Sequence, residues 1–165
     1  MYYSCFEKRV YSPVKWILIT VVLLLFAGLI AYIAMALQSH KRPENIGLQQ
    51  GVLRICPDSP NCVCSESHSQ DSEQHAIAPL KAGDDTWARL NAIIANQGGV
   101  IQQDDGRYLH ATFTTPVFRY VDDVELRFDQ AQGVIHLRSA SRVGHSDFSV
   151  NRHRIQRIKQ RLEKR

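Results

Sequence analysis

The chain has 165 residues, of which 44% are hydrophobic, with four Cys, nine Gly and six Pro. This length suits one modest domain with an appendage rather than two full domains. Near-average Gly and Pro contents exclude collagen-like and low-complexity proteins, and four Cys are too few for a small disulfide-built protein. The net charge of +4 is unevenly distributed, since residues 1–42 sum to +4, residues 43–149 to −6 and residues 150–165 to +6. An acidic body with a basic tail is not a uniformly basic nucleic-acid-binding protein, so we expect no nucleic-acid partner.

A long apolar segment near the N-terminus predicts a transmembrane helix. Residues 16–37 are 22 positions without a charge. At about 1.5 Å per residue they span about 33 Å, enough for a hydrocarbon core of about 30 Å. A cleaved signal peptide is the alternative, because Ala34-Met35-Ala36 fits a small-x-small cleavage site. The run exceeds the apolar core of about 7–15 residues usual for a signal peptide, so we favour an uncleaved single-pass anchor.

The charges that flank this segment predict its orientation. Three basic residues precede it, and two follow it closely. Because basic residues are enriched on the cytoplasmic side, we expect a cytoplasmic tail (1–15), a transmembrane helix (16–37), a linker (38–47) and a non-cytoplasmic domain (48–165). The predicted location is the cell (inner) membrane, which the chain crosses once.

After the linker, the pattern of residues predicts an α+β domain. Residues 56–74 are rich in Pro, Ser, Asp and Asn and are expected to be a loop, and residues 75–80 a short strand. A helix is expected from Asp84 or Asp85 to Gln97, ended by Gly98-Gly99. Period-two alternation predicts strands at 100–103, 107–115, 118–129 and 134–142, and Ser149 is expected to cap a last helix at 150–164. This order favours an antiparallel sheet of four to five strands with two helices.

The third and fourth of these strands carry charged side chains whose register can be predicted. Even positions of 118–128 are mostly apolar, with Asp122 among them, while Asp123 and Glu125 point the other way. Matching the apolar faces requires paired residue numbers to sum to an odd number, and the length of the hairpin favours 261 or 263. Arg138 then faces Asp123 or Glu125 in a cross-strand ion pair worth about 0.2–1 kcal/mol. Asp122 would face Ser139 or Ser141 as a partly buried carboxylate in need of hydroxyl or Arg donors.

Basic and hydroxyl side chains near the fourth strand and the start of the last helix predict an anion site. Guanidinium groups and a helix N-terminus both favour anions. The candidate ligand-binding residues are Arg138, Ser139, Ser141, Arg142, Asp147, Asn151 and Arg152. The competing interpretation is that all of them serve the fold.

An enzyme is the second class of function, a hydrolase or a thiol-dependent protein using Asp122, Ser141 or Cys62. Adjacent strand residues point to opposite faces, so Asp122 and Asp123 do not form a catalytic pair. Ser141, His145 and Asp147 lie too close in sequence for a typical nucleophile triad. No nucleotide-binding loop, nucleophile elbow or metalloprotease motif occurs. We therefore assign no catalytic residue.

Cys56 and Cys62 enclose a loop of turn-forming residues, and a disulfide between them is geometrically plausible. Free structural thiols and a metal site with Cys64 and His68 or His75 are the alternatives. The spacing of that set does not match common zinc patterns. We predict no metal and no cofactor.

Several motifs together resemble a bacterial and plant family catalogued as domain of unknown function 1499. They are the CPDSPNCV string at 56–63, YLHA at 108–111, VDDVE at 121–125, RSASR at 138–142 and the segment from Gly144 to Arg152. The resemblance covers about residues 48–163 and implies a compact domain without a reaction to transfer. Cys64, His145 and Ser149 stand where Ser, Tyr and Gly are more typical of the family.

The last helix carries seven basic residues around an apolar stripe of Ile155, Ile158 and Leu162. In the simpler interpretation the basic face of this helix is exposed to solvent. In the more specific one it contacts the headgroups of anionic lipids. The sequence thus predicts a membrane-anchored, non-enzymatic binding or interaction domain, whose partner is a small anionic ligand or a protein. A purely structural membrane protein is a further alternative.

Overall fold

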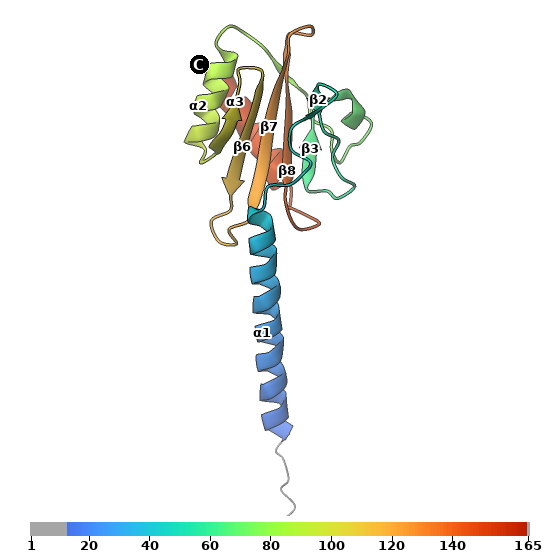
Figure 1. Cartoon of the computed structure of the whole chain (residues 1–165), viewed down its shortest axis with the longest axis vertical. Coiled ribbons are helices and arrows are strands. Elements are labelled where there is room, and N and C mark those ends of the chain that lie inside the picture. Colours follow the sequence, from blue (N-terminus) through green and yellow to red (C-terminus); the bar gives the residue numbers. More distant parts are fainter. Residues whose placement is uncertain (1–12, 165) are drawn as a thin grey trace, which may run out of the picture. The chain divides into compact units, whose positions relative to one another are not determined.

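The structure is a computed structural model that describes residues 13–164. The chain divides into two compact units, Met1–Met35 and Ala36–Arg165. The helices are α1 (Pro13–His40), α2 (Thr86–Asn96) and α3 (Val150–Glu163), with a short 3-10 helix η1 (Ser67–Ser69). The strands are β1 (Leu48–Gln49), β2 (Val52–Leu53), β3 (Cys62–Cys64), β4 (Leu80–Lys81), β5 (Val100–Asp104), β6 (Tyr108–Thr114), β7 (Val121–Asp129) and β8 (Val134–Ser141). The fold class is α+β, as predicted (Figure 1).

Helix α1 is long and apolar enough to cross a membrane, judged by its length and composition. Its apolar side chains are exposed, Leu25 by 71% and Leu24 by 67%. That exposure distinguishes α1 from the buried core helix of a soluble protein. A signal sequence near the N-terminus has the same properties and stays the alternative.

The larger sheet has six antiparallel strands in the order β3-β8-β7-β6-β5, with β4 pairing beside β8. The register of β7 and β8 pairs residues whose numbers sum to 263, so Glu125 faces Arg138 and Asp122 faces Ser141. Both pairings are among those predicted. Gly106, between β5 and β6, and Gly133, between β7 and β8, both have a positive φ in the turns of their hairpins.

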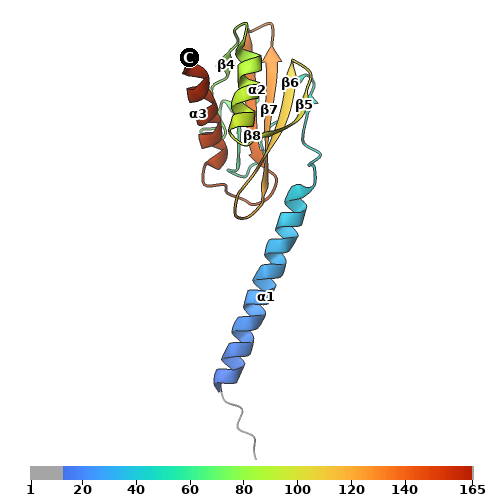
Figure 2. The same cartoon turned by 90° about the vertical axis from the view of Figure 1, so that its left-hand side faces the viewer.

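Helices α2 and α3 cover one face of this sheet (Figure 2). The core between them is apolar, with Leu90 and Ile94 from α2, Ile155 and Ile158 from α3, and Leu126 from β7 all fully buried or nearly so. Helix α2 ends as predicted. Gly98 has a φ of +87°, and a Cβ on Gly99 would lie 2.6 Å from a side-chain carbon of Ile94.

The opposite face of the sheet is also buried, and this corrects the expectation of a weak cross-strand ion pair. The segment after α1 and the chain around β3 lie over that face (Figures 1 and 2). Glu125 and Arg138 are 0% and 1% exposed. Their ion pair is therefore fully buried, and the stabilisation of about 0.2–1 kcal/mol expected for an ordinary cross-strand pair does not apply to it.

Three local expectations were wrong in detail. Residues 62–64, expected within a loop, form β3 on the edge of the sheet beside β8. Asp85 and Ser149 occupy the N-cap positions of α2 and α3, but neither side chain makes a capping hydrogen bond. At α3 the carboxylate of Asp147 takes that role, accepting hydrogen bonds from the backbone N–H groups of Ser149 and Asn151.

Candidate functional site

Three alternate residues of β7 form the centres of three ionic clusters on the sheet face opposite the helices. Their side chains point to this face because side chains alternate along a strand. They are Asp123, Glu125 and Arg127, exposed by 2%, 0% and 9%. Charges buried to this extent persist only when they are paired, and each of the three has a partner of opposite charge.

The middle cluster is built on Glu125. Its Oε2 accepts a hydrogen bond of 2.7 Å from Arg138 Nη1, and its Oε1 accepts from the Tyr108 hydroxyl at 2.7 Å and from the Gly47 backbone N–H at 2.8 Å. Burial, followed by the adjacent carboxylate, raises the pKa of Tyr108 well above its ordinary value. Within the described residues, Nε and Nη2 of Arg138 have no hydrogen-bond partner.

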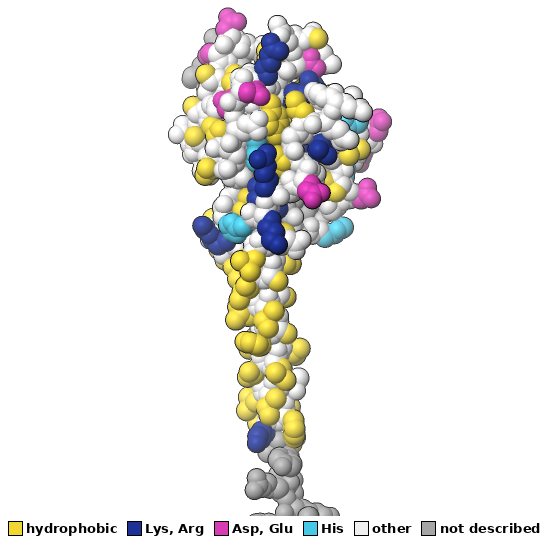
Figure 3. Space-filling view, viewed as in Figure 1, with side chains coloured by type: hydrophobic (Ala, Val, Ile, Leu, Met, Phe, Trp, Pro, Cys, Tyr) yellow, Lys and Arg dark blue, Asp and Glu magenta, His cyan; other side chains and the backbone are white. Residues whose placement is uncertain are grey.

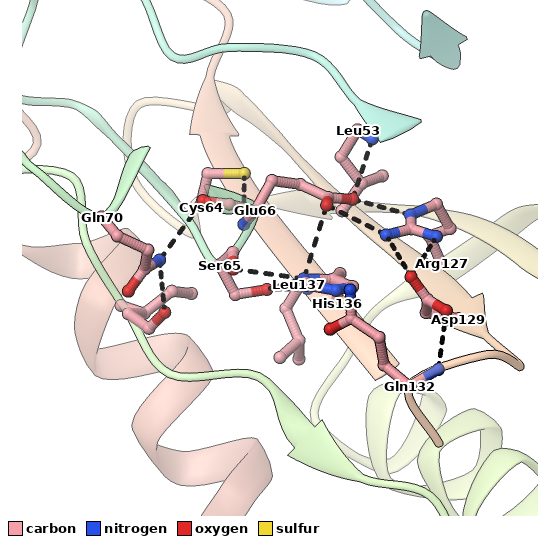
Figure 4. Close-up of polar contacts among 11 residues, drawn as sticks. Leu53, Cys64, Ser65, Glu66, Gln70, Arg127, Asp129, Gln132, His136 and Leu137 are labelled. Atoms are coloured by element: carbon pink, nitrogen blue, oxygen red, sulfur yellow. Dashed lines mark hydrogen bonds and ion pairs between the residues drawn. The ribbon is translucent and has the colours of Figure 1, made fainter. Parts of the chain in front are cut away.

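The cluster on Arg127 lies toward the end of β7 (Figure 4). The guanidinium binds Glu66 through two hydrogen bonds, of 2.7 and 3.0 Å, and also contacts Asp129. Burial alone would raise the pKa of Glu66, but the hydrogen bonds from Arg127 and from the Leu53 backbone outweigh burial and lower it. Glu66 and Leu53 thereby connect β2 and the segment after β3 to β7 of the sheet.

The cluster on Asp123 includes His110 and Arg142. Arg142 binds the carboxylate through two hydrogen bonds, of 2.8 and 2.7 Å, and His110 Nε2 lies 2.7 Å from Oδ1. Burial alone would raise the pKa of Asp123, but the hydrogen bonds from Arg142 and His110 lower it. Arg142 Nη1 also donates to the backbone carbonyls of Ser39 and Lys41. Arg142 therefore connects the end of α1 to β7.

A cavity of about 320 Å³ lies beside the Asp123 cluster, and we call it the Arg142 cavity. Its lining is His40, Arg42, Gln102, His110, Thr112, Thr114, Val121 and Arg142. None of these residues is acidic, and two are Arg. In Figure 3, Lys, Arg and His side chains gather along the middle of the visible face of the domain.

Two groups of the Arg142 cavity have unused hydrogen-bonding capacity. Arg42 is exposed and makes no hydrogen bond or ion pair with any residue that the structure describes. His110 is 2% exposed, and its Nδ1 has no partner in the same part of the chain. A buried polar atom without a partner is uncommon in proteins, so this nitrogen has capacity for a further hydrogen bond.

The seven residues predicted as an anion site do not lie in one pocket. Arg138 is in the Glu125 cluster, and Arg142 lines the Arg142 cavity. Ser139, Ser141, Asp147 and Asn151 are on the other face of the sheet, in a network of hydrogen bonds toward α3. Arg152 donates to the carbonyls of Glu73, Gln74 and Ala76. A strand presents adjacent residues to opposite faces, so the side chains of one continuous RSASR motif are divided between the two faces of the sheet.

On the helix face, Asp122 is 3% exposed and is paired with Arg154 at 2.5 Å. The structure thus buries this carboxylate and gives it an Arg donor. The sequence analysis did not select Arg154 itself. Its signal was helical spacing, because Arg154 stands three residues after Asn151 and four before Ile158 and so shares the inward face of α3.

The cysteines are arranged as a disulfide and one thiol. Cys56 and Cys62 are bonded, with their Cα atoms 5.6 Å apart, and Cys64 is free and buried. Burial raises the pKa of the Cys64 thiol. Among the described residues, no group of three His, Cys, Asp or Glu is placed to hold a metal ion. Cys5 lies outside the described residues.

These features define an α+β domain whose antiparallel sheet is buried on both faces, apolar on one and ionic on the other, preceded by a helix of membrane-spanning length. The family model described as "Protein of unknown function (DUF1499)" matches residues 52–162. The chain therefore belongs to this family. No curated protein and no solved structure matches the chain.

Proposed function

We propose that the protein is a single-pass membrane-anchored binding module, without catalytic activity, that holds an anionic group in the Arg142 cavity. The observation that carries the proposal is the lining itself. Two guanidinium groups and two imidazoles meet there without an acidic neighbour in the lining, and Arg42 is exposed with no carboxylate partner among the described residues. Guanidinium groups bind carboxylates and phosphates with paired, charge-assisted hydrogen bonds.

Asp123, a carboxylate behind the lining, engages only one of the two guanidinium groups of the cavity. Asp123 is behind the lining and 2% exposed, and both of its oxygens already accept hydrogen bonds from Arg142. Arg42 and Arg142 bring two positive charges to the lining, and the ion pair with Asp123 balances the charge of Arg142. A binding role for Arg142 keeps one of the seven predicted residues at the site.

Residues with catalytic chemistry are engaged elsewhere, which favours binding over catalysis. Cys62 is in a disulfide, Asp122 is paired with Arg154, and Ser141 accepts a hydrogen bond from Asn151. The enzyme hypothesis built on these three groups would require each of them to leave its partner.

We place the domain on the non-cytoplasmic side of the inner membrane. The flanking charges and the Cys56–Cys62 disulfide support this location, because disulfides persist in oxidising compartments. Alkylating native membranes with and without reduction, and weighing the peptide that contains both cysteines, tests it. A free pair of thiols would contradict the location.

The anion site is tested with the full chain in detergent micelles and inorganic phosphate as the probe. Phosphorus NMR of phosphate should show saturable broadening with the wild type. The variant Arg42→Gln should weaken binding at least about tenfold, because one charge-assisted hydrogen bond is worth about 1.5–3 kcal/mol. Lys41→Gln is the matched control, since Lys41 is the adjacent cation and is not in the lining. Equal affinities for all three proteins would refute the site.

A further inference from the structure

We propose that the anionic group in the Arg142 cavity is the phosphate of an anionic phospholipid in the membrane that α1 crosses. This inference rests on the proposed anion site and names its ligand. The argument uses the position of the cavity along the chain, the donors that line it and the electrostatics of the helix end.

Chain connectivity brings the first two residues of the lining, His40 and Arg42, close to the end of the apolar run. His40 is three residues beyond Leu37, the last residue of the apolar run, and both are in α1. At about 1.5 Å per residue, His40 is about 5 Å past the hydrocarbon edge along the helix. Headgroup layers add about 5–8 Å on each side of a bilayer core. The first two basic residues of the lining thus come from the part of the chain that emerges among the phosphates.

The donors suit a phosphodiester with a polar substituent. Arg42 offers all its N–H groups, and Arg142 keeps one N–H of Nη2 beyond its bond to Asp123. His110 Nε2 already faces the Asp123 carboxylate, so Nδ1 of the neutral ring is an acceptor, suited to a headgroup hydroxyl rather than to the phosphate oxygens. The neutral side chains of Gln102, Thr112 and Thr114 line the same cavity and suit headgroup hydroxyls.

The partial negative charge at the C-terminus of α1 would repel an anion, and hydrogen bonds from Arg142 reduce this repulsion. The C-terminus of a helix carries about half a negative charge on its last carbonyl groups. Arg142 Nη1 donates to the carbonyls of Ser39, His40 and Lys41. These hydrogen bonds cover the negative end of the helix on the side of the cavity, so that the field of Arg42 is not cancelled there.

The test uses the full chain in neutral micelles that contain equimolar phosphatidylglycerol and phosphatidylcholine, with bound lipids counted by native mass spectrometry. We expect one phosphatidylglycerol to be retained in preference to phosphatidylcholine. Arg42→Gln should lower this preference about tenfold. Lys41→Gln should change it no more than about twofold, because an exposed charge at physiological salt is screened within about 8 Å. Arg157→Gln, an exposed cation of α3, is the control for lipid contact through the last helix.

Each outcome decides between the two proposals. Equal losses from Arg42→Gln and Lys41→Gln indicate diffuse surface attraction and overturn the lipid site, as does a loss confined to Arg157→Gln. Phosphate binding that depends on Arg42, without any lipid preference, leaves the anion site standing and overturns the lipid ligand. Failure of both probes overturns both proposals. An intact mass showing cleavage after Ala36 removes the membrane from the argument and overturns the inference.

Discussion

The buried pair of Glu125 and Arg138 makes the sharpest prediction about stability. Replacing Arg138 with Met keeps much of the side-chain volume but leaves the carboxylate of Glu125 with two neutral donors instead of a cation. At 2.7 Å and an effective dielectric constant of about 20, the Coulomb attraction of the pair is about 6 kcal/mol. Desolvation offsets part of this attraction, and removing one partner of a buried pair costs about 3–5 kcal/mol.

We expect Arg138→Met to lower the free energy of unfolding by about 3–5 kcal/mol. The double variant with Glu125→Gln should recover at least about 2 kcal/mol of this loss, because a neutral amide needs no counter-ion and its oxygen still accepts from Tyr108. Unfolding in denaturant would be followed by the fluorescence of Trp87, which packs against the helix-side core. A Trp16→Phe background and micelles keep the full chain in use and remove the signal of the second tryptophan.

The double-mutant cycle also states what would refute the reasoning. If the two substitutions cost amounts that simply add, the charges are not coupled. If Arg138→Met lowers the free energy of unfolding by less than about 1 kcal/mol, the pair of Glu125 and Arg138 stabilises the domain no more than an exposed ion pair would. Either result would mean that water reaches this face.

Three further predictions follow from other parts of the domain. Replacing Cys56 and Cys62 with Ala should lower the free energy of unfolding by about 2 kcal/mol, the loop-closure value for a sequence separation of 6, and an unchanged denaturation midpoint would contradict it. The lowered pKa values of Asp123 and Glu66 mean that their contribution to stability is present above their unfolded values of about 3.9 and 4.3 and is lost as pH falls through the native values. Denaturant titrations between pH 7 and 2 should therefore show stability falling below about pH 4, and a flat profile would count against these pairs. Gly99→Ala should cost about 1–3 kcal/mol by thermal unfolding, because its Cβ would meet an isoleucine of α2 at 2.6 Å, and a cost near zero would show that the core yields.

Local pattern was enough to predict the strands from β5 to β8 and both domain helices. The period of two along β7 and β8 places Val124 and Leu126 on one face and Glu125 on the other, and only a few registers then match the apolar faces. The pairing of Glu125 with Arg138 follows from that register. The Cys56–Cys62 disulfide is equally local, because its turn-rich loop keeps the two residues close.

What lies over the second face of the sheet was decided by tertiary structure. A charged strand face is typical of solvent exposure, and nothing local distinguishes it from a buried ionic face. Glu66 from the segment after β3 and Gly47 from the segment after α1 contact the sheet 61 and 78 residues away in sequence. Those contacts turn β7 into a central strand buried on both sides.

The sequence alone determined the membrane-length helix, the α+β class and most of the strand register, because each depends on residues near one another in the chain or on a repeating pattern. Only the tertiary structure divided the seven predicted anion-binding residues among four places and brought Arg42 beside Arg142. The reason is geometric. Alternating residues of a strand face opposite sides, and a cavity forms where segments about 100 residues apart meet.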